Sequence, residues 1–334
     1  MDPIKKFCPL ALLALVLFAL TAVTACKQEE EEEETPGSMS GTIVYDIPYY
    51  VLKGETVTMT ASGIIYPKEV FYKWFVSGVY SDTLTASTIT VKFPDSLGVF
   101  TVSAHSYAPG FYSSSTSQQV TTIDTTWNTS LSGLSRDDQY IIDERDDQAY
   151  YYVTIGDLDW FSQNLAWDGV GTPFQASDAA APLFGSFYTW NEAVEMEVCP
   201  EGWRVPTQED WESFAEALAG KPLPFIDNWK GLGVLASVDA KMNGNRIWPY
   251  SPDNAHTNDF GWNALPLGFT FVGSEKLVTG YSEYGCWWSA TEKNDTQAYY
   301  RYIWYDLGDF PMSYTDKDDM RASVRCVRTH PQSL

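Results

Sequence analysis

The stretch CPEGWRVPTQEDW, from Cys199 to Trp211, places a cysteine and three acidic residues within thirteen positions. Paired carboxylates can act as acid and base in glycoside hydrolysis. The candidates for such work are Glu209, Asp210 and Glu212 in one group, and Asp143 and Asp146 in another. The first group lies at the predicted start of a helix, where acidic side chains favour the helix dipole. The second group lies in a predicted turn, so we expect neither group to catalyse.

Metal ligands are sparse and scattered. The three histidines, His105, His256 and His330, are far apart in the sequence, and a lone histidine does not make a metal centre. Two oxygen-rich loops, Thr315–Met320 and Ser251–Asp259, carry ligands that calcium prefers. Solvated loops are the favoured interpretation, with calcium as the alternative, and we predict no cofactor. The sequence also lacks a Gly-rich phosphate loop and a nucleophile elbow.

The N-terminus predicts export and lipid attachment. Lys5 and Lys6 precede the apolar run Leu10–Val23, which is too short to span a bilayer but fits a secretory signal. The run ends in VTAC, which resembles a bacterial lipobox, so residues 1–25 are predicted to be a lipoprotein signal peptide. Cleavage before Cys26 and acylation of its sulfur would give a lipid anchor rather than a membrane span.

Residues 26–40 predict an acidic, flexible tether. The run KQEEEEEE is self-repelling and buries nothing, which favours an extended chain. Directly behind an acylated cysteine it resembles the surface-export signal of Bacteroidetes-type lipoproteins, the alternative being a plain solvated spacer. We therefore expect a surface-exposed lipoprotein of the outer membrane that touches the membrane only through its lipid. The net charge of −23 argues against a nucleic-acid partner.

Residues 41–123 predict an all-β module. ETVTMTAS, VFYKWFV and GVFTVSAHS are short alternating segments separated by Gly, Pro and Ser turns. Their order resembles immunoglobulin-like and PKD-like sandwiches of bacterial surface proteins, in which the tryptophan-bearing strand fills the core. We therefore expect Trp74 to be buried and the module to act as a spacer.

Residues 124–334 predict an α+β domain with few regular elements. Twelve of the thirteen tryptophans lie here. AYYYVTIGDLDWFSQNL predicts two strands joined by a turn at Gly156 and Asp157, and SFYTWNEAVEM predicts a short helix. The clearest helix follows Pro206, with Thr207 as N-cap, Asp210 completing a capping box, and Gly220 ending it. Further strands are expected near AYYRYIWYD and ASVRCVR.

This domain resembles the Fibrobacter succinogenes major paralogous domain family. The resemblance covers residues 137–328 and is carried by the motifs IIDERDDQAYYYVTIGDLDWFSQNL, GSFYTWNEAV, CPEGWRVPTQEDWESF, GFTFVG, CWWSAT and SVRCVR. More distantly, GWRVPTQEDWESFAEA and the closing RCVR resemble the formylglycine-generating, sulfatase-modifying fold, a variant of the C-type-lectin-like architecture. The enzymes of that fold hold copper with two closely spaced cysteines, whereas Cys286 and Cys326 are far apart. We therefore expect no enzyme activity.

The remaining cysteines predict one disulfide and one thiol. Cys8 leaves with the signal peptide and Cys26 carries the lipid, so Cys199, Cys286 and Cys326 remain in an oxidising compartment. Cys199 opens the CPEGW motif and Cys326 lies in the closing strand, as expected for a bridge that fastens the end of the domain to its middle. Cys286 is then the buried thiol.

The sequence favours recognition as the function, of a glycan or a surface protein. We expect loops within residues 225–285 to carry it, because they combine aromatic rings with amide and acidic groups. The predicted ligand-binding residues are Trp229, Trp248, Tyr250, Trp262, Tyr284 and Arg246. Two alternatives remain: a structural or adhesin subunit of a surface assembly, and a divergent enzyme of the sulfatase-modifier type.

Overall fold

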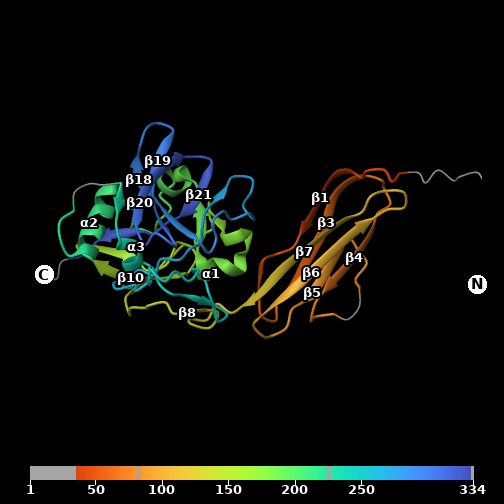
Figure 1. Cartoon of the computed structure of the whole chain (residues 1–334), viewed down its shortest axis with the longest axis horizontal. Helices are drawn as coiled ribbons and strands as arrows, with labels where there is room; N and C mark the ends of the chain where they lie inside the picture. The colour runs from red at the N-terminus through yellow and green to blue at the C-terminus, as the bar shows by residue number, and fades with distance from the viewer. Residues whose placement is uncertain (1–34, 81–82, 224–226, 332–334) are drawn as a thin grey trace, which may run out of the picture.

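The computed structural model describes residues 35–80, 83–223 and 227–331 of the chain (Figure 1). With 42% of residues in strands and 11% in helices, the protein is β-rich. Within those residues, no helix combines the length and the apolar character needed to cross a membrane. The predicted signal peptide, the predicted acylation site Cys26 and the acidic run to Glu34 lie outside the described residues.

Strands β1 to β7 form two facing sheets, which we call the N-terminal sheets. One sheet has the order β1 (Ser40–Asp46), β3 (Thr56–Tyr66), β5 (Thr88–Lys92). The other has the order β2 (Tyr50–Leu52), β7 (Ser114–Ile123), β6 (Gly98–Tyr107), β4 (Phe71–Val76). Strands are thus found in all three segments whose alternation predicted them.

The N-terminal sheets enclose one hydrophobic core. Inward-pointing residues of both sheets meet there, including Met59, Val91 and Val102. Trp74 is buried among them, as its strand predicted, and its indole nitrogen donates to the Ala86 carbonyl at 2.8 Å. Because side chains alternate across a strand, the other face of β7 presents Ser117, Gln119 and Thr121 outward.

The C-terminal region, residues 124–331, is built from three further sheets. The largest runs in the order β12 (Thr172–Pro173), β13 (Ser186–Tyr188), β21 (Met320–Ser323), β18 (Tyr284–Glu292), β19 (Gln297–Trp304), β20 (Phe310–Asp316), β14 (Asn228–Trp229), with β17 (Thr270–Phe271) paired to β21. The second has the order β22 (Val327–Thr329), β11 (Leu158–Phe161), β10 (Ala149–Ile155), β9 (Tyr140–Ile142). The third has the order β16 (Asn245–Arg246), β15 (Lys241–Met242), β8 (Leu131–Ser132).

The longest helix described is α2 (Gln208–Ala219), and its ends are those the sequence predicts. The Thr207 side chain accepts from the Asp210 backbone amide, the Asp210 side chain accepts from that of Thr207, and Gly220 ends the helix in the left-handed region. The other helices are α1 (Ala181–Phe184), α3 (Leu232–Ala236), the 3-10 turns Phe174–Ala176 and Asp178–Ala180, and the π-helical turn Asn191–Glu195. SFYTWNEAVEM therefore begins with strand β13, and the predicted helix is reduced to a single π-turn after it.

The N-terminal sheets are docked onto the C-terminal region (Figure 1). Tyr50 is buried at this junction, with its ring 5.9 Å from Phe184 and 6.1 Å from Phe174. The Ser177 hydroxyl donates to the Tyr50 carbonyl at 3.0 Å, and the Asn243 side chain donates to the Thr122 carbonyl at 3.0 Å. The two parts therefore share a packed and hydrogen-bonded interface rather than a bare linker.

Candidate recognition site

A cleft of about 670 Å³ lies at this junction. Strand β7 and Tyr49 form one wall, and the β15–β16 hairpin with Tyr281 and Ser282 forms the other. Five side-chain amides line it: Gln118, Gln119, Gln175, Asn243 and Asn245. The N-terminal sheets, expected to serve only as a spacer, thus form half of the cleft.

The backbone conformation of the β15–β16 turn shapes the wall of the cleft that this hairpin forms. Asn243 has a φ of 46° and Gly244 a φ of 85°, which allows the tight turn between β15 and β16. The turn directs Asn243 toward Thr122 and leaves Asn245 exposed at the cleft. This hairpin lies within the predicted recognition segment 225–285.

Arg246 and Tyr250 are the two predicted binding residues that are exposed. Arg246 lines the cleft and its guanidinium lies 2.9 Å from the Asp239 carboxylate. Its charge is therefore partly neutralised by a neighbour in the same wall. Tyr250 is 74% exposed, with its ring centroid 5.8 Å from Arg246, but it lies outside the cleft lining.

The other four predicted binding residues are core residues, which corrects the sequence-based assignment. Trp229, Trp248 and Trp262 are fully buried, and Tyr284 is nearly so. Trp262 packs 4.9 Å from Trp287 and 5.0 Å from Phe214, ring centroid to ring centroid. A ring that is enclosed on all sides has no free face on which a ligand could stack.

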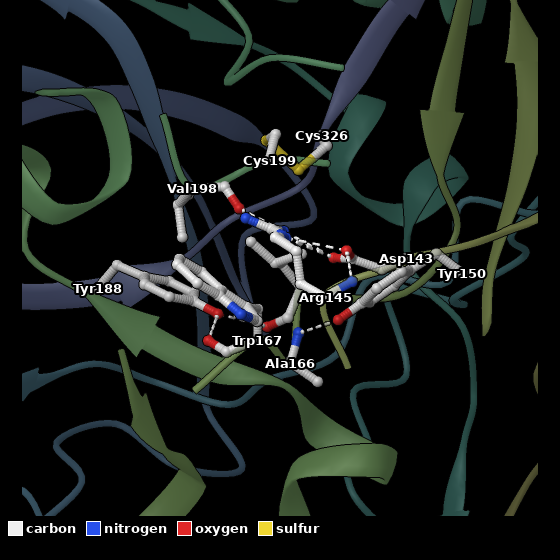
Figure 2. Close-up of a disulfide and its surroundings, with 10 residues drawn as sticks. Asp143, Arg145, Tyr150, Ala166, Trp167, Tyr188, Val198, Cys199 and Cys326 are labelled. Atoms are coloured by element: carbon white, nitrogen blue, oxygen red, sulfur yellow. Dashed lines mark hydrogen bonds and ion pairs between the residues drawn. A yellow bond between two sulfur atoms is a disulfide. The ribbon is translucent and has the colours of Figure 1, made fainter. Parts of the chain in front are cut away.

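The stretch from Cys199 to Trp211 has a structural role in the C-terminal region. Cys199 and Cys326 form the expected disulfide, with Cα atoms 5.9 Å apart across a sequence separation of 127 (Figure 2). Beside it, the Arg145 guanidinium bonds to the Val198 carbonyl at 2.9 Å and to Asp143 at 2.6 Å (Figure 2). These bonds hold the backbone of Val198, the residue directly before Cys199, in place. Cys286 is a buried free thiol, and burial raises its pKa.

Two of the candidate acid–base carboxylates, Asp210 and Asp143, are paired with arginines. Burial raises the pKa of Asp210, but hydrogen bonds from Arg204 and Thr207 outweigh it and hold that pKa below its ordinary value. Asp143 is paired with Arg145 in a turn, where burial raises the pKa of Asp146. Glu212, on the first turns of α2, has its pKa raised by burial and by Glu209.

The histidines also have structural neighbours. The His256 ring stacks on Trp248 with centroids 4.8 Å apart, and burial lowers its pKa. His330 lies 2.7 Å from the buried carboxylate of Asp159, which Arg328 contacts at 2.9 Å. Across residues 35–80, 83–223 and 227–331, no three His, Cys, Asp or Glu side chains are grouped closely enough to hold a metal ion.

Comparison with known proteins supports a family assignment. A family model described as the Fibrobacter succinogenes major domain matches residues 153–328, which is more than half of the chain. Comparison with curated proteins and with solved structures gave no match. The matched segment runs from β10 to β22 and contains the disulfide, α2 and the β15–β16 hairpin. The chain therefore belongs to the Fibrobacter succinogenes major domain family.

Proposed function

We propose that this protein is a non-catalytic recognition lipoprotein that binds a glycan in the cleft between its N-terminal sheets and its C-terminal region. The observation that carries the proposal is the lining of that cleft. Side-chain amides and hydroxyls on both walls can donate to and accept from sugar hydroxyls, and Tyr49 and Tyr281 offer aromatic surface. Its volume falls within the range of about 300–1,000 Å³ typical of small-ligand sites.

The state of the cysteines supports binding over sulfatase-modifier chemistry. That chemistry needs two adjacent thiols, whereas here Cys326 is held in a disulfide and Cys286 is buried alone. Among the candidate acid–base carboxylates, Asp210 pairs with Arg204 and Asp143 with Arg145. None of the five candidate carboxylates lines the cleft.

We also propose a fold type for each of the two parts of the chain. Two facing sheets with Trp74 in a shared core suit an immunoglobulin-like sandwich over residues 41–123. A disulfide that ties the last strands to the middle of the region, together with long loops, suits a C-type-lectin-like domain over residues 124–334.

The proposed location is the cell surface, through acylation of Cys26 behind the acidic run. Cys26→Ala should release the protein from the membrane fraction. Changing Glu29–Glu34 to glutamine should leave the protein membrane-bound but protected from protease added to whole cells. Unchanged protease access would contradict the export role of the acidic run.

Glycan-array screening of the mature chain, residues 26–334 with Cys26→Ser to keep it free of lipid, tests the function itself. With a hit in hand, Gln119→Ala and Asn245→Ala should each weaken binding about tenfold, because each removes a ligand hydrogen bond from one wall. Tyr250→Ala is the matched control, since this exposed residue of the same region lies outside the cleft lining. Unchanged affinity in both cleft variants would place the site elsewhere.

A further inference from the structure

A second cavity, of about 400 Å³, opens on the C-terminal region and shares no lining residue with the cleft. Trp127, Arg136 and Tyr151 line it, together with the Asn128 amide and the apolar side chains of Leu131 and Leu183. Trp127 is 40% exposed, whereas most tryptophans of this region are buried. The aromatic surface that the sequence predicts for ligand stacking is therefore present, but at a different position.

Arg136 is held in this cavity by aromatic rings. Its guanidinium carbon lies 3.6 Å from the centroid of the Tyr151 ring and 4.7 Å from that of Trp127. Stacking of this kind fixes the plane of the guanidinium while its N–H groups point outward within that plane. The side chain is thus oriented without using any of its hydrogen-bond donors.

The absence of a polar partner distinguishes Arg136 from every other arginine. The chain has eight arginines, all within the described residues, and the other seven each bond to a carboxylate, an amide or a carbonyl oxygen. The Arg136 side chain makes no hydrogen bond or ion pair among the residues that the structure describes, although Asp137 and Asp138 follow it directly. In a chain of net charge −23, an exposed arginine that its acidic neighbours leave unpaired is available to an external anion.

We propose that this cavity binds an acidic sugar residue. The planar fork of Arg136 matches a carboxylate, which it can engage through two parallel hydrogen bonds. The exposed ring of Trp127 suits the C–H face of a pyranose, and the Asn128 amide suits its hydroxyls. A small inorganic anion would use only the arginine, whereas the sugar ring also uses the aromatic and apolar surface. This site is independent of the cleft and would exist whether or not the cleft binds a glycan.

Calorimetric titration of the mature chain with tetragalacturonate and with its fully methyl-esterified form tests the proposal, at about 0.15 M salt so that long-range repulsion is screened. The acid should bind at least tenfold more tightly than the ester. Arg136→Gln should abolish that preference. Arg136→Lys should retain only part of it, because an ammonium lacks the planar fork. Trp127→Ala should weaken both probes about tenfold. Lys230→Gln, which removes an exposed positive charge outside the linings of both cavities, should leave the preference unchanged.

Three outcomes would overturn the proposal. Equal binding of acid and ester would show that the carboxylate is not recognised. A preference that survives Arg136→Gln would place the anion site elsewhere. Displacement of the sugar by inorganic sulfate at an equal concentration would show a plain anion site. Tetragalacturonate binding that survives the cleft variants Gln119→Ala and Asn245→Ala but is weakened by Arg136→Gln would support this proposal whether or not the cleft binds a glycan.

Discussion

Trp262 shows how a single residue of the C-terminal region can be essential for stability. Its ring lies 5.8 Å from that of Trp211 and 4.9 Å from that of Trp287, and its carbonyl accepts a hydrogen bond from Arg325 at 2.5 Å. Trp262→Ala should lower the free energy of unfolding by about 3–5 kcal/mol, because it leaves a cavity in a packed core. Chemical denaturation followed by circular dichroism measures this.

Trp127→Ala is the control for that measurement. This tryptophan is partly exposed, and its truncation should change the free energy of unfolding by no more than about 0.5 kcal/mol. Similar losses for the two variants would contradict the different burial of the two side chains.

Arg246, which the sequence predicted as a binding residue, lines the cleft, whereas most of the aromatic residues predicted with it are buried. Trp262 does lie in a loop, as its surroundings indicate, but Arg325 donates to the carbonyls of Trp262 and Asn263 and draws this loop into the interior. That contact joins residues about sixty positions apart, so no local pattern could show it. The Arg136 cavity was missed for the same reason, since Tyr151 reaches Arg136 only through the fold.

At the scale of a single element, the stability of helix α2 depends on the capping of its first turn. Thr207→Ala removes the side-chain oxygen that accepts from the Asp210 amide. The free energy of unfolding should fall by about 1 kcal/mol, as for other N-cap truncations. Thr207→Ser keeps the acceptor and serves as control, so an equal loss in both variants would argue against capping as the cause.

The same turn predicts a dependence of stability on pH. The pKa of Asp210 is lower in the folded protein than in the unfolded chain, so its contribution is complete above the unfolded pKa near 3.8. That contribution is lost as the pH falls through the lower folded value. Denaturation midpoints measured from about pH 6 to pH 3 should therefore fall more steeply for the parent than for Asp210→Asn. Parallel curves would contradict this role.

Elements fixed by local signals were predicted well, and those fixed by distant partners were not. Helix α2 has its cap, its apolar stripe and its terminal glycine within one short stretch, and the β10–β11 turn has Gly156 at a φ of 64°. The segment from Ser186 was predicted to be helical. It forms strand β13 because Phe187 and Tyr188 pair with Ser323 and Ala322 of β21, more than a hundred residues later.

For the whole molecule, the disulfide links the middle of the C-terminal region to its last strands. Opening it frees a loop that spans 127 positions in the unfolded chain. Replacing both Cys199 and Cys326 by serine should lower the free energy of unfolding by up to about 4–5 kcal/mol, by the chain-entropy argument. Cys286→Ser is the control, and non-reducing peptide mapping should find the bridge intact in that variant. A bridge to Cys286 in the parent would overturn this pairing.

The junction predicts that the two parts of the molecule unfold together. Tyr50 belongs to strand β2 but packs against Phe174 and Phe184 of the C-terminal region. Calorimetry of the parent should show one transition, and Tyr50→Ala should split it into two, because the shared core is lost. Tyr112→Ala, an exposed residue of the N-terminal sheets, should retain a single transition. Two transitions already present in the parent would show that the interface does not couple the parts.

The pairing of β2 with β7 also has a mechanical consequence if the chain is anchored at its N-terminal side, as proposed. The two strands run in parallel, with Tyr50 opposite Thr121 and Leu52 opposite Ile123. Under the proposed lipid anchorage, tension that reaches β2 from the N-terminal side and β7 from the C-terminal region would pull the two strands in opposite directions along their own length. The hydrogen bonds of the ladder lie across that direction, so they are sheared together rather than unzipped one after another. Under the proposed anchorage, this shear geometry should make the N-terminal sheets resist mechanical unfolding.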